Sequence, residues 1–147
     1  MIPRNVQLSR ALLAVTAASH LVIPIVLWAR QDSLRAEIVA QHPDFGPATV
    51  DDSVRVALTS ATVFHSLLLL LCAFLVLKLA TGKPWTRRLA TVSQALSILF
   101  SLVSWSTSPL FHAVVPVLGV VQLITIALLW TGSARGFFHP ARVPARV

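Results

Sequence analysis

Long apolar stretches without charged side chains dominate the pattern along this chain. Residues 11–29, 56–77 and 89–134 contain no Asp, Glu, Lys or Arg. A hydrocarbon core of roughly 30 Å is crossed by about 20 helical residues, so the first two stretches each predict one membrane-spanning helix. The third stretch would form a helix of roughly 70 Å, which is too long for a single span.

A polar turn divides the third stretch. Ser106, Thr107 and Ser108 precede Pro109, and a proline disfavours helix at the residue before it. The pattern therefore predicts four spans, at about 9–29, 56–79, 87–106 and 109–131. The first apolar run continues past the small residues 16–19, where a signal peptide would be cleaved, so we expect a retained helix.

The short connections that follow the second and third spans predict antiparallel neighbours. We therefore expect an all-α integral membrane protein, a four-span up-down helical bundle that forms a single domain over residues 1–147. In size and span count the chain resembles small four-span bacterial membrane proteins. This is a likeness of architecture, and it carries no motif from which the role of a residue can be transferred.

Composition and charge agree with a membrane location. The chain has 147 residues, of which 56% are hydrophobic and 12% charged, whereas a soluble domain usually has about 25% charged residues.

All five acidic residues lie within 30–55, while the N-terminus, the 78–88 connection and the 132–147 tail carry only basic charges. Basic loops remain in the cytoplasm. Both termini and the basic tail are therefore expected to be cytoplasmic, and the chain to lie in the cytoplasmic (inner) membrane. This asymmetry explains the net charge of +7 without nucleic acid.

The acidic segment 30–55 is expected to be an outer loop. Within it, Leu34, Ile38 and Val39 recur at helical spacing before Pro43. This spacing predicts a short helix on the membrane surface, with an ordinary polar linker as the alternative. The tail contains Phe137 and Phe138 beside basic residues, which is typical of contact with anionic lipid, or of a frayed end.

No standard catalytic motif is present, and no Asp or Glu lies within a predicted span, so we expect a protein that is not an enzyme. Histidines are the remaining candidates. His20 and His65 lie equally far from Arg30 and Arg55, the outer ends of their spans, and therefore at the same depth. His112 lies near the outer end of the fourth span. Such rings hydrogen-bond neighbouring helices, bind a small ligand, or ligate a metal or haem.

Polar side chains on shared helical faces complete the candidate site. The candidate ligand-binding residues are His20, His65, His112, Ser19, Thr62, Ser66, Gln94, Ser101 and Gln122. His20 and His65 would be the ligands if the site held haem b or another metal. Pro24 and Pro116 each follow a histidine by four residues, which predicts a kink and a free histidine carbonyl in both spans. Ser97 and Ser101 are expected to be buried.

These observations predict a small non-enzymatic membrane protein that binds a partner protein or a small hydrophobic ligand through a polar core in its outer half. A redox subunit that binds haem or a quinone is one alternative, and an oligomeric channel or carrier is the other. The expected partners are membrane lipid and either another membrane protein or further copies of this chain.

Overall fold

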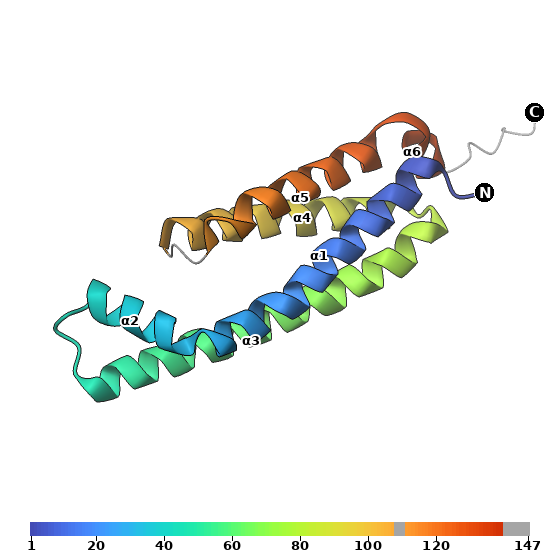
Figure 1. The fold of residues 1–147 in the computed structure, drawn as a ribbon. Coiled ribbons are helices and arrows are strands. Elements are labelled where there is room, and N and C mark those ends of the chain that lie inside the picture. Colours follow the sequence, from blue (N-terminus) through green and yellow to red (C-terminus); the bar gives the residue numbers. More distant parts are fainter. Residues whose placement is uncertain (108–110, 140–147) are drawn as a thin grey trace, which may run out of the picture. The chain divides into compact units, whose positions relative to one another are not determined.

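The computed structural model describes residues 1–107 and 111–139, and within these ranges the chain is helical with no strand (Figure 1). The expected break at 106–109 can be described only up to Thr107, where a helix ends. Residues 108–110 lie outside the described ranges. The elements are α1 (Arg4–Ala29), α2 (Gln31–Gln41), α3 (Pro47–Lys78), the 3-10 helix η1 (Leu79–Thr81), α4 (Pro84–Thr107), α5 (Val114–Trp130) and α6 (Gly132–Phe137).

Three helical segments are long and apolar enough to cross a membrane: α1, α3 with η1, and residues Pro84–Trp105 of α4. No more than 28% of the apolar window of each helix is buried inside the chain. Large side chains such as Ile25, Leu67 and Leu99 are more than half exposed, as expected for helices that face lipid. The chain is thus a helical membrane protein. The apolar helix α5 is shorter, with 17 residues, and the fourth span stays a prediction.

The second long helix begins earlier than its apolar pattern indicates. α3 starts at Pro47 rather than at residue 56, and the Val50 N–H bonds to the Gly46 carbonyl at 3.1 Å. Proline is favoured at a first helical position because its fixed φ suits the helix and its missing N–H has no acceptor there. The apolar stretch predicts only the hydrophobic part of the helix. The more polar residues 47–55 that precede it are helical as well.

A short helix, α2, occupies part of the acidic segment and ends two residues before Pro43. None of its residues is buried. Arg35 of α2 forms an ion pair with Asp51 of α3, and this hydrogen bond raises the pKa of the Arg35 guanidinium. Both side chains are largely exposed, so salt will screen the pair. The position of α2 relative to a membrane surface stays a prediction.

The chain divides into two compact units. Unit 1 contains Met1–Thr16 and Cys72–Val147, and unit 2 contains Ala17–Leu71. In unit 2 the later part of α1 runs beside the first part of α3 (Figure 1). In unit 1, α4 and α5 form an antiparallel pair, and Asn5 of α1 donates to the carbonyl of Thr131 at 3.2 Å. The single four-helix domain stays a prediction.

Candidate functional site

Two histidines meet inside unit 2. His20 projects from α1 and His65 from α3, and their Nδ1 atoms lie 3.0 Å apart. The ring centroids are 5.2 Å apart and the ring planes are inclined by 41°. This is the distance and arrangement of a hydrogen bond between the rings. The two rings therefore face one another across α1 and α3.

The second ring nitrogen of His20, Nε2, has no hydrogen-bond partner among the described residues. The His20 side chain is only 4% exposed, and its Nε2 atom is buried without a hydrogen bond to any residue in 1–107 or 111–139. The Nδ1 atom of His20 is hydrogen-bonded to His65. The Nε2 atom of His20 can therefore donate a hydrogen bond in one tautomer of the ring and accept one in the other. A buried polar atom without a partner is costly, so a polar group is expected to meet it.

The neighbouring residues hold the pair in place. The Trp28 Nε1–H donates to Thr62 Oγ1 at 3.0 Å, which ties α1 to α3 one turn from His65. The ring of Phe64 meets the ring of His65 edge-on, with centroids 5.7 Å apart. Ser19 is half-buried, whereas Ser66 is exposed. Ser66, one of the predicted site residues, is exposed because successive helical residues are about 100° apart and His65 already faces α1.

A second polar cluster lies in unit 1, between α4 and its neighbours. The Gln122 amide donates to Ser97 Oγ at 2.8 Å, and the Gln94 amide lies 3.9 Å from the sulfur of Cys72. Both glutamine side chains are 1% exposed. The expected burial is confirmed for Ser97, whereas Ser101 is half-buried. Within the described ranges the two Oε1 atoms, of Gln94 and Gln122, have no partner.

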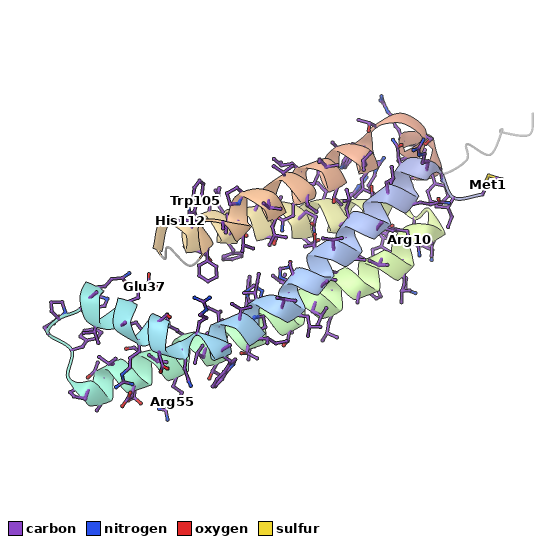
Figure 2. All side chains as sticks on the ribbon, in the orientation of Figure 1. Met1, Arg10, Glu37, Arg55, Trp105 and His112 are labelled. Carbon is purple, nitrogen blue, oxygen red and sulfur yellow. The ribbon has the colours of Figure 1, made fainter. Side chains whose placement is uncertain are left out.

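His112 lies just before α5, also in unit 1. Its Nε2 atom is 3.1 Å from the carbonyl oxygen of Trp105, and the two rings meet edge-on (both residues are labelled in Figure 2). The expected kink at Pro116 is wrong. Since α5 begins at Val114, Pro116 lies in the first turn, where a backbone N–H has no helical acceptor in any case. Pro24, in contrast, lies inside α1 and lacks the N–H that would bond the His20 carbonyl.

The predicted site residues are thus divided between the units. His20, His65, Ser19, Thr62 and Ser66 belong to unit 2, and His112, Gln94, Ser101 and Gln122 belong to unit 1. A site that combines both groups stays a prediction.

The spacing of the histidine pair differs from that of two axial haem ligands. Two nitrogens on opposite faces of a haem iron, each about 2.0 Å from the metal, would lie about 4 Å apart, compared with the 3.0 Å between the Nδ1 atoms. In the described part of the chain, no group of three or more His, Cys, Asp or Glu side chains could hold a metal ion.

Sequence reasoning missed one further residue, Arg87 of α4. It is 6% exposed, and its guanidinium carbon lies 4.0 Å from the centre of the Trp130 ring. In the sequence it is one of several basic residues in the inner connection. No pattern distinguishes it from the adjacent Arg88, which is exposed.

Comparisons with family models, with curated proteins and with solved structures find no match to this chain.

Proposed function

We propose that this chain is a four-span protein of the cytoplasmic membrane, with both termini inside, that binds a small hydrophobic ligand at the His20–His65 pair. The ligand carries a carbonyl or hydroxyl group that meets the Nε2 atom of His20. The protein acts by binding and not as an enzyme. The observation that carries the proposal is the buried Nε2 atom, which has no partner in residues 1–107 and 111–139.

The chemistry of the pair defines the ligand class. The apolar helices that carry the two rings favour a hydrophobic molecule. The His20 Nε2 atom, which has no partner among the described residues, favours one polar group on that molecule. A hydroxyl group suits either position of the ring proton, since it both donates and accepts. A quinone carbonyl suits the state in which His20 carries its proton on Nε2. A quinone-binding redox subunit is therefore a special case of the same proposal.

A channel through the serine face of α4 has less support. The hydroxyl of Ser97 accepts a hydrogen bond from Gln122 of α5, so this face contributes to helix packing.

The orientation is supported by the distribution of charge. Every acidic residue belongs to unit 2, within 30–55, whereas unit 1 contains nine basic residues and no Asp or Glu. The test replaces the buried Cys72 by serine and introduces single cysteines at Ser33 and Thr81, which are both exposed. In intact cells a membrane-impermeant maleimide should label position 33 and leave position 81 unlabelled. Labelling at position 81 would contradict the four-span orientation.

Ligand binding is tested with two probes of matched chain length, a decyl-substituted benzoquinone and decylbenzene, added to the full-length protein in detergent. We expect the quinone to bind with at least about tenfold higher affinity, because only it offers an acceptor to the free nitrogen. His20→Phe should remove this preference, and the exposed control Ser66→Phe should keep it. Equal affinity of the wild-type protein for both probes would refute the proposal that the ligand is a carbonyl compound. Mass spectrometry of organic extracts of the purified protein would then show whether a hydroxyl compound accompanies wild type and is lost with His20→Phe.

A further inference from the structure

A buried arginine, Arg87, lies in unit 1 with no acidic partner among residues 1–107 and 111–139. The Arg87 guanidinium carbon is 4.0 Å from the centre of the Trp130 ring and 5.5 Å from that of Phe138, and the side chain is 6% exposed. Two of its three nitrogens, Nε and Nη1, are buried and form no hydrogen bond with any described residue. Contact with aromatic rings stabilises a guanidinium partially, but it leaves the N–H donors unused.

No acidic side chain is available to Arg87 within its unit. All five Asp and Glu residues of the chain lie in unit 2, and both ion pairs found in the described ranges are formed there. The nearby groups that interact electrostatically with Arg87 are Arg88 and Arg135, which carry the same charge. An uncompensated buried charge is strongly destabilising, so an anion is expected to meet this guanidinium.

The surroundings of Arg87 are fixed by hydrogen bonds. The Trp130 Nε1–H donates to Thr91 Oγ1 at 2.8 Å, and the Thr91 hydroxyl donates to the Arg87 carbonyl at 3.0 Å. Thr91 therefore links the Trp130 indole to the backbone carbonyl of Arg87. On the other side, Phe138 is 1% exposed and its N–H bonds to the Ala134 carbonyl at 3.3 Å. Both aromatic neighbours thus have defined positions.

We propose that Arg87 binds the phosphate group of an anionic membrane phospholipid. The planar guanidinium offers several N–H donors at once, which matches the oxygens of a phosphate better than an ammonium group does. Arg135 adds positive charge beside it. Trp130 is 44% exposed, and Leu123, two turns earlier on the same side of α5, is 58% exposed. This apolar row offers a surface for an acyl chain, which favours a lipid over a free phosphate ion.

The test measures lipid binding to the full-length protein in nanodiscs of phosphatidylcholine, with phosphatidylglycerol as the titrated anionic lipid and native mass spectrometry as the readout. We expect wild type to retain one phosphatidylglycerol at least about tenfold more tightly than phosphatidylcholine. Arg87→Met, which removes the charge but keeps the apolar stem, should abolish this preference. Arg88→Met is the matched control, since it removes the same charge one residue away at an exposed position, and it should retain most of the preference.

A further variant and a free-phosphate arm complete the design. Arg87→Lys keeps the charge without the planar donors and should retain only part of the preference; it also serves if Arg87→Met does not fold, which circular dichroism checks. Inorganic phosphate at millimolar concentration should leave bound phosphatidylglycerol in place. Displacement by inorganic phosphate would overturn the lipid assignment. Equal binding of the two lipids by wild type, equal losses in Arg87→Met and Arg88→Met, or full preference in Arg87→Lys would each overturn the site.

Discussion

Substituting the more exposed histidine of the pair should destabilise the protein more than substituting the buried one. His20 is 4% exposed and already has one nitrogen without a partner. In His65→Phe the Nδ1 atom of His20 loses its partner as well, so that neither ring nitrogen is hydrogen-bonded to a described residue. In His20→Phe the buried polar ring itself disappears, and the half-buried His65 is free to find another partner.

The magnitudes follow from the cost of an unpaired buried group. His65→Phe should lower the free energy of unfolding by about 1–2 kcal/mol, the range for a buried polar atom left unsatisfied. His20→Phe should lower it by roughly 0–1 kcal/mol, because its removal also relieves the unpaired Nε2 atom. The double variant should lie close to His20→Phe, since replacing both partners of a hydrogen bond by apolar rings is nearly neutral. The coupling energy then equals the cost of His65→Phe, about 1–2 kcal/mol, at the upper end of the range measured between membrane helices.

The assay is unfolding by sodium dodecyl sulfate in nonionic detergent, followed by circular dichroism, for wild type, both single variants and the double variant. Ser66→Phe places the same ring at an adjacent exposed position of α3 and should change the free energy by less than about 0.5 kcal/mol. The reasoning is refuted if His20→Phe is clearly more destabilising than His65→Phe, or if the coupling energy is below about 0.3 kcal/mol.

Two further predictions use the same unfolding assay. Ser97→Leu should cost about 2–3 kcal/mol, because it overpacks a buried position and leaves the Gln122 amide without an acceptor, whereas Leu99→Ala at an exposed position should cost under about 1 kcal/mol; equal costs would show that the serine face has no packing role. Gly132 has a φ of +53°, and a Cβ there would lie 2.9 Å from Asn5 Nδ2, so Gly132→Ala should cost about 1–2 kcal/mol. Gly136→Ala has open space around it and should be neutral or slightly stabilising; an unchanged Gly132→Ala variant would contradict the turn geometry.

The meeting of His20 and His65 could be predicted because it depends on regular quantities. Helical rise is constant, and two antiparallel helices whose outer ends are marked by Arg30 and Arg55 bring residues at equal distance from those ends to equal depth. The rotation of each helix decides whether the rings face one another, and the polar face of α1 and α3 indicated it. Hydrophobic pattern does not define helix ends, however. α3 extends into the charged residues from Pro47, and α5 begins too late for Pro116 to bend it.

The burial of Arg87 could not be predicted in this way. It depends on Trp130 and Phe138, which are far from Arg87 in the sequence and reach it through the pairing of α4 with α5 and the turn into α6. The local sequence pattern does not distinguish Arg87 from Arg88. Only the rotation of α4 within unit 1 buries the first and exposes the second.

Nitrogen-15 magnetic resonance of the histidine rings tests the central claim most directly. The full-length protein, labelled at histidine nitrogens and held in detergent micelles, is measured with and without the decyl-substituted benzoquinone, and His20→Phe and His65→Phe assign the signals. We expect a scalar coupling between the two Nδ1 atoms across their hydrogen bond, and a shift of the His20 Nε2 signal when the quinone binds. Two rings that both carry their only proton on Nε2, without coupling between the Nδ1 atoms and without a shift on addition of the quinone, would contradict it.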